Sequence, residues 1–266
     1  MIDEKVFLGY PIDFQGICKI YPPTVNEVIG NENFGPYHAL LTITQEQLDD
    51  IYAPEEQNTF QVPLNPMDRQ PTSFMRQQHI PTPFEYLMIN YHQSEEIQKI
   101  LHEGFMKIVH EPITVVPEIK LLLIGKSEDE LDPDIDLENP RIITEDNYFN
   151  FQNTLRIAIG DKPVEPYDVN EDPRIRRIKA LGRLRQKRSA EANKHKAPTL
   201  GTYLAAICCM GIGLTPLNIG EMSYANVSWL IGMYQQNEEY DIDIRALLAG
   251  ADSKKVKPKY WIKNIS

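Results

Sequence analysis

Short runs of β-branched and apolar residues mark two places where the chain is expected to form strands. Phe7–Ile12 and Ile17–Tyr21 predict a small hairpin near the start of the chain. Ile113–Val116 and Ile119–Ile124 predict a second hairpin, to which Arg141–Thr144 is a candidate third strand. Both sheets are therefore expected to be small.

Most of the remaining apolar residues recur at steps of three and four, which is typical of helices that bury one face. Thr24 with Glu27, and Thr44 with Gln47, have the spacing of helix-starting capping boxes, and Gly160 is placed to end a helix. Helices are predicted after Thr24, over 35–41, after Thr44, over 83–109, 145–159 and 172–196, and in the last quarter of the chain. This helical pattern is interrupted by the proline-rich segment Ala53–Pro83 and by a linker, Asn193–Thr199.

The pattern as a whole predicts an α+β fold that is mainly helical, with small β-hairpin elements and a helical C-terminal region. A chain of 266 residues has room for one large domain or two modest ones. We expect an N-terminal α+β domain over 1–165, a basic helix and linker over 166–198, and a C-terminal helical region with a basic-aromatic tail over 199–266.

Charge is distributed unevenly along the chain. The formal net charge is −11, yet residues 174–196 hold ten basic residues against the single acidic Glu191. This segment carries +9, so the rest of the chain carries −20. The basic residues are Arg174, Arg176, Arg177, Lys179, Arg183, Arg185, Lys187, Arg188, Lys194 and Lys196. Such an arrangement favours contact with something acidic.

The basic segment is predicted to be a helix that begins after Asp172 as N-cap with Pro173 in its first turn. One apolar face is expected at Ile175, Ile178, Leu181 and Leu184. Three interpretations stay open for its cations: exposure to solvent or pairing within the chain, contact with a protein partner, or binding of nucleic acid phosphates. Nucleic acid is the least favoured, because no aromatic residue lies between Tyr167 and Tyr203. Arg176, Arg177, Arg183 and Arg185 are the candidate contact residues of this helix.

Composition indicates a globular protein, with 42% hydrophobic and 24% charged residues. The apolar run Leu200–Leu214 is broken by glycines and is too short for a membrane span, so no membrane contact is expected. The acidic start of the chain does not have the pattern of an export signal. Cys18, Cys208 and Cys209 form no metal or disulfide motif, which favours a reducing cytoplasm.

The sequence contains only incomplete versions of nucleotide-binding and metal-binding motifs. Gly125-Lys126-Ser127 ends like a phosphate-binding loop, but Lys120 stands where the loop's first glycine belongs. The acidic run from Asp132 resembles a calcium loop without its glycine and glutamate. We therefore expect no catalytic residues, no metal and no cofactor, and predict that the protein is not an enzyme.

The C-terminal helices and tail carry residue types that are common in protein interfaces. Met222, Trp229 and Met233 lie in the helical part, and Tyr260 and Trp261 follow four lysines in the tail. These five residues are candidates for partner binding. The alternative is that they pack inside the protein's own core.

The same C-terminal stretch resembles a known group of proteins. Gly201–Trp229 and Ala249–Asn264, with the opening Ile17–Ile29, resemble tail assembly chaperones and tape-measure-associated tail proteins of siphophages and prophages of low-GC Gram-positive bacteria. Softer similarities lie at Thr82–Leu87, His110–Thr114 and Asn147–Asn153, so that most of the chain is covered.

This resemblance implies a tail assembly chaperone that binds the tape measure protein during tail morphogenesis, with the tail tube protein and self-association as further candidate contacts. It implies a location in the host cytoplasm during infection or prophage induction, with the virion as the other candidate. A structural component of the tail or head-tail connector is the alternative, and a nucleic-acid-binding accessory protein is a weaker one.

Overall fold

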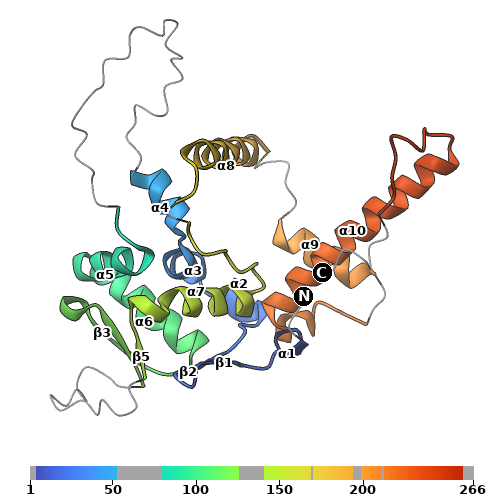
Figure 1. Cartoon of the computed structure of the whole chain (residues 1–266). Coiled ribbons are helices and arrows are strands. Elements are labelled where there is room, and N and C mark those ends of the chain that lie inside the picture. Colours follow the sequence, from blue (N-terminus) through green and yellow to red (C-terminus); the bar gives the residue numbers. More distant parts are fainter. Residues whose placement is uncertain are drawn as a thin grey trace, which may run out of the picture.

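The computed structural model describes residues 4–52, 80–125, 141–168, 170–193, 199–210 and 213–259, without the side chains of residues 4, 5, 173, 177 and 193. This part of the chain is mainly helical with two small antiparallel sheets, which confirms the predicted fold class (Figure 1). In chain order the elements are α1 (Glu4–Phe7), β1 (Ile12–Phe14), β2 (Cys18–Ile20), α2 (Val25–Ile29), α3 (Phe34–Thr42), α4 (Gln45–Tyr52), α5 (Pro83–Gln93), α6 (Glu95–Ile108), β3 (Ile113–Val116), η2 (Pro117–Ile119), β4 (Leu121–Ile124), β5 (Ile142–Ile143), α7 (Glu145–Ile159), α8 (Pro173–Asn193), α9 (Leu200–Cys209), η4 (Ile219–Glu221) and α10 (Tyr224–Leu248).

The first hairpin is shorter than expected and begins later. β1 pairs with β2 from Ile12↔Ile20 to Phe14↔Cys18, whereas the predicted strand Phe7–Ile12 is wrong, because its first residue ends helix α1. The turn decides this register: the Asp13 carboxylate accepts a hydrogen bond from the Gly16 N–H at 3.0 Å, which places the closing pair at Phe14.

The second sheet has the order β3-β4-β5, all antiparallel, and confirms Arg141–Thr144 as the site of a third strand. The predicted strand at Ile119 instead begins at Leu121, because Lys120 adopts a left-handed backbone with φ 50° after the short helix η2. Arg141 joins this sheet to the first hairpin: its guanidinium donates to both carboxylate oxygens of Glu111 at 2.6 and 2.7 Å and to the Ile17 carbonyl at 2.6 Å. The hydrogen bonds from Arg141 hold the pKa of Glu111 below its usual range.

A single large core lies between the two sheets and helices α3, α5, α6 and α7. Tyr37, Phe105 and Phe151 are nearly fully buried in it, with the rings of Phe105 and Phe151 stacked 5.6 Å apart. The helical region predicted over 83–109 is divided at Ser94, whose side chain caps α6 by accepting from the Ile97 N–H. Helix α7 runs over the predicted residues and ends at Gly160 in a left-handed conformation, as expected.

The C-terminal helices form a second, smaller hydrophobic cluster, and they share it with α2 from the other end of the chain. Ile207 of α9, Ile219 of η4 and Val227 of α10 are buried together with Val25 of α2. In Figure 1, the first half of α10 lies beside α1 and α2, with α9 packed against it, while the outer half of α10 projects away. The division at residues 165 and 198 stays a prediction, but the contacts cross it.

No helix in the described ranges combines the length and apolar content that a membrane crossing requires.

Candidate partner-binding surfaces

Helix α8 is fastened to the acidic helix α4 by one arginine, and we call this contact the Arg183 latch. The Arg183 guanidinium donates to both carboxylate oxygens of Asp50, at 2.8 and 2.9 Å, and to Glu46 at 2.8 Å. Arg183 is half-buried, and these bonds raise its pKa above its ordinary value. Because one guanidinium binds two carboxylates, this contact fixes the rotation of α8 about its axis as well as its position.

The segment before α8 uses the third acidic residue of α4. The Tyr167 hydroxyl donates to Asp49 at 2.7 Å, and burial together with this bond raises the pKa of Tyr167 to about 12. The Arg176 guanidinium lies over the Tyr167 ring, 5.5 Å from its centroid. Lys179 pairs with Glu171 at 2.5 Å. The basic residues on the inner side of α8 are therefore paired within the chain, which is one of the three interpretations of this basic segment.

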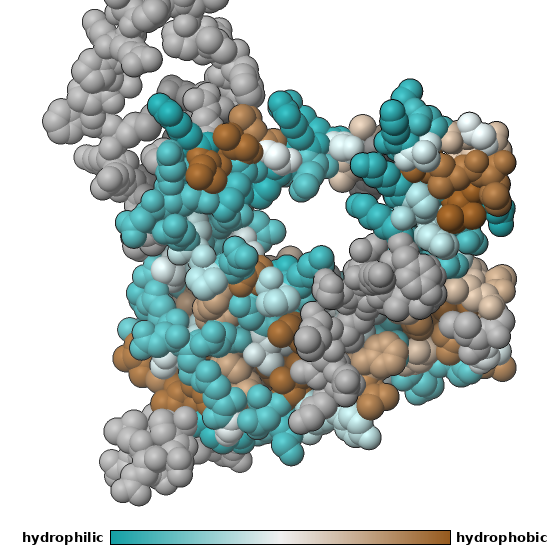
Figure 2. Space-filling model, turned by 45° about the vertical axis from the view of Figure 1, so that its right-hand side comes forward, coloured by the Kyte–Doolittle hydropathy of each residue, from teal (hydrophilic) through white to brown (hydrophobic). Residues whose placement is uncertain are grey.

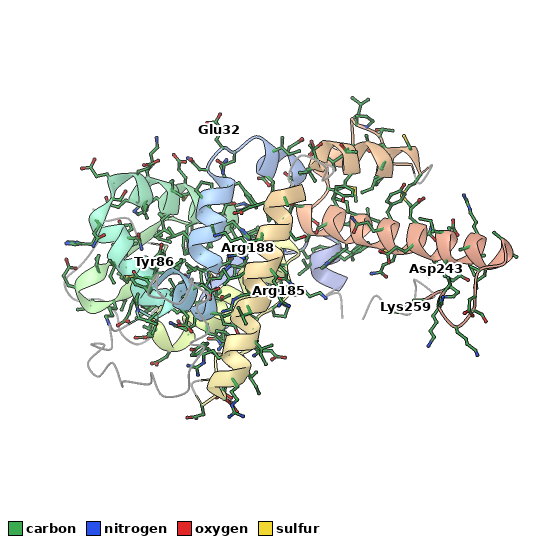
Figure 3. The ribbon with its side chains drawn as sticks, turned by 90° about the horizontal axis from the view of Figure 1, so that it is seen from above. Glu32, Tyr86, Arg185, Arg188, Asp243 and Lys259 are labelled. Atoms are coloured by element: carbon green, nitrogen blue, oxygen red, sulfur yellow. The ribbon has the colours of Figure 1, made fainter. Side chains whose placement is uncertain are left out.

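The side of α8 opposite Arg183 presents a mixed stripe of cations and aliphatic residues. Arg174, Ile178, Leu181, Arg185 and Arg188 follow one another at alternating steps of four and three, which places them on one face of a helix. We call these five residues the outer stripe of α8. Within the described part of the chain its arginines make no ion pair, and Ile178 is 68% exposed. Seen from above, α8 crosses in front of the body of the protein, with Arg185 and Arg188 labelled (Figure 3).

This stripe corrects one detail of the predicted apolar face. Leu181 and Leu184 are half-buried, but Ile178 and Ile175, the latter 49% exposed, face solvent. The helix is held to the body by polar contacts with α4 rather than by an apolar stripe. In Figure 2, separate brown hydrophobic patches stand among hydrophilic side chains on the upper part of the face shown.

The C-terminal cluster is attached to the N-terminal segment by backbone and side-chain contacts. The Val25 N–H donates to the Met222 carbonyl at 2.9 Å, and the Tyr224 N–H donates to the Pro23 carbonyl at 2.7 Å. The Phe7 and Trp229 rings stack 5.9 Å apart. Gly220 packs so closely on Asn26 that an added Cβ would lie 2.3 Å from its side-chain oxygen.

The structure separates the predicted partner-binding residues into two groups. Arg176, Arg183 and Arg185 lie on α8, but the first two face inward and only Arg185 belongs to the outer stripe. Met222, Trp229 and Met233 are half-buried in the C-terminal cluster or along α10, with Met222 and Trp229 in contact with the protein's own residues. The Arg177 side chain, Tyr260 and Trp261 lie outside the described residues.

Four exposed residues in the segment that contributes to this cluster were not predicted from the sequence pattern. Leu217 is 93% exposed and Met210 is 41% exposed, and Ala205 and Cys209 on α9 are also exposed. We call these four residues the α9 rim. The helical repeat of α9 could have indicated that part of so apolar a helix faces outward, whereas the position of Leu217 depends on the turn that leads into η4.

The described ranges contain no group of three or more metal-binding side chains. A groove of about 550 Å³ lies beside α5, lined in part by Met88, Ile89 and His92, with the Lys120–Glu85 ion pair among its lining residues. Two further histidines have partners in the fold: His102 hydrogen-bonds to Tyr91 at 2.9 Å, and His110 stacks on Tyr21. The phosphate-loop residue Lys126 and the acidic run after it lie outside the described residues.

Comparison with known protein families finds a match for one part of the chain. Residues 191–266 match the family model described as the YomV second domain. The match covers α9, η4 and α10, and it indicates a phage-derived domain family. No curated protein and no solved structure matches the chain.

Proposed function

We propose that the protein is a phage tail assembly chaperone, which binds the tape measure protein through the C-terminal cluster while the tail is built. The match of residues 191–266 to a phage-derived domain family supports the phage context. The resemblance of the same stretch to tail assembly chaperones supports the finer role. The observation that carries the binding site is the α9 rim, which lies within the matched region.

The chemistry of the rim suits a helical client with an apolar stripe. Exposed apolar side chains that gather on one surface are a common mark of protein-binding sites, and the four residues of the rim are close in sequence. Met210 adapts its shape to different partners, and Leu217 offers nearly its whole side chain. The strongly negative body would keep a complex with such a client dissolved.

Co-expression with the tape measure protein tests this proposal. Met210→Ser with Leu217→Ser is expected to lower the recovery of dissolved tape measure protein severalfold, because both substitutions remove exposed apolar contact area. Ile119→Ser is the matched control, since Ile119 is 64% exposed but lies in η2, outside the C-terminal cluster. Each substitution is at the surface and should change the free energy of unfolding by less than about 0.5 kcal/mol. Equal recovery with the double variant and the wild type would place the client site elsewhere.

A further inference from the structure

The outer half of α10 presents a face that complements the outer stripe of α8 in charge. Glu238, Glu239, Asp241 and Ile242 are exposed there, and Ile242 is 61% exposed. Arg245 is exposed on the same side and Leu248, 83% exposed, lies at its end. We call these six residues the outer face of α10. Three carboxylates against one guanidinium make the face acidic, with aliphatic residues among the charges.

The opposite side of this helix is covered by the chain that follows it. Tyr240, Ile244 and Leu247 are half-buried, and so are Val256 and Pro258 of the following segment. Figures 1 and 3 both show that segment returning along α10, and Figure 3 labels Asp243 and Lys259 near the outer end. The residues of the outer face of α10 therefore stay exposed in the presence of this segment.

We propose that two copies of the chain associate head to tail, with the outer stripe of α8 in one copy against the outer face of α10 in the next. Both faces have exposed aliphatic residues, Ile178 on one and Ile242 with Leu248 on the other, flanked by charges of opposite sign. Helices with such faces can pack side by side, burying the aliphatic residues while the charges pair at the edges. This inference does not depend on which phage role the protein has.

Features of α8 favour a second copy over nucleic acid as the occupant. The Arg183 latch holds the outer stripe facing away from α4, so that it is presented as a rigid surface. Phosphates would be bound by the arginines alone and would leave Ile178 exposed. The acidic face of α10 would repel a nucleic acid but would attract the stripe of another copy.

The two faces are different surfaces, so the contact is heterologous. Such a contact closes into a ring if the rotation between copies allows it, and otherwise continues as a filament. The net charge of −11 opposes association at long range, so the contact is expected to be weak and to depend on the local pairing of charges.

Sedimentation velocity of purified full-length protein at high micromolar concentration tests the proposal. The wild type should form dimers or larger species. Arg188→Glu should raise the dissociation constant on the order of tenfold, because it replaces an attraction with a repulsion. Lys187→Glu is the matched control: it makes the same change of charge on the next residue, off the outer stripe, and should have a much smaller effect.

A charge-swap mixture makes the test specific to these two faces. One variant carries Arg185→Glu with Arg188→Glu, and the other carries Glu238→Lys with Glu239→Lys. Each alone should be monomeric, because its one changed surface repels the unchanged partner surface of another copy. Their equimolar mixture should associate again, because the unchanged stripe of the second variant can meet the unchanged face of the first, and the two reversed surfaces also have opposite charges. A monomeric wild type would overturn the proposal, and so would a mixture that stays monomeric. Tight binding of a short DNA duplex that Arg188→Glu abolishes, without self-association, would assign the stripe to nucleic acid instead.

Discussion

Gly160→Ala is expected to lower the free energy of unfolding by about 3 kcal/mol, because it adds a side chain where the end of α7 contacts α10. Gly160 ends α7 with φ 92°, a backbone conformation that glycine adopts more readily than other residues. A Cβ at this position would lie 2.8 Å from the Cα atom of Ala225, which belongs to the backbone of α10. The neighbour cannot rotate away, so α7 and α10 would have to move apart.

Gly250→Ala is the matched control for this substitution. Gly250 has φ 95°, but nothing lies within 4 Å of its added Cβ. Its cost should be limited to the backbone strain, roughly 1 kcal/mol. Urea unfolding followed by circular dichroism measures both variants. If the two cost the same, the C-terminal cluster does not pack on the end of α7 as described.

Val25→Asp is expected to release the C-terminal cluster while the main core stays folded. Val25 is 2% exposed and is one of four buried residues in that cluster, so a carboxylate there would be buried without a partner, at a cost of more than about 3 kcal/mol. Hydrogen exchange over residues 199–248 should rise strongly, whereas exchange over α6 and α7 should change little.

Ile29→Asp places the same charge on the same helix at a position that is 59% exposed. It should leave hydrogen exchange unchanged over both regions. Faster exchange in α9 and α10 with Ile29→Asp, or none with Val25→Asp, would mean that α2 is not part of the C-terminal cluster.

Local signals were enough to predict most helices. Thr24 and Thr82 cap α2 and α5 through their own side chains, and Gly160 ends α7, so each of these limits depends on residues a few positions apart. Strand limits were predicted less well, because pairing starts where the turn permits it. The Asp13–Gly16 hydrogen bond moved β1, and the left-handed Lys120 shortened β4.

The candidate surfaces depend on contacts between residues far apart in sequence, which periodicity does not contain. The charges of α4 and α8 are visible in the sequence, but the pairing of Arg183 with Asp50 is not. Equally, nothing near Val25 indicates that it packs with Ile207 and Val227. Trp229 is a typical interface residue by type, yet its stacking on Phe7 occupies one side of its ring.

We propose that this protein assists tail building as a chaperone of the tape measure protein. Quantitative mass spectrometry of infected or induced cells and of purified particles tests it most directly. We predict that the protein is abundant in lysates, co-purifies there with the tape measure protein, and is absent from finished particles. Its presence in particles at a fixed number of copies, comparable with other tail proteins, would contradict the chaperone role and assign it to the tail structure.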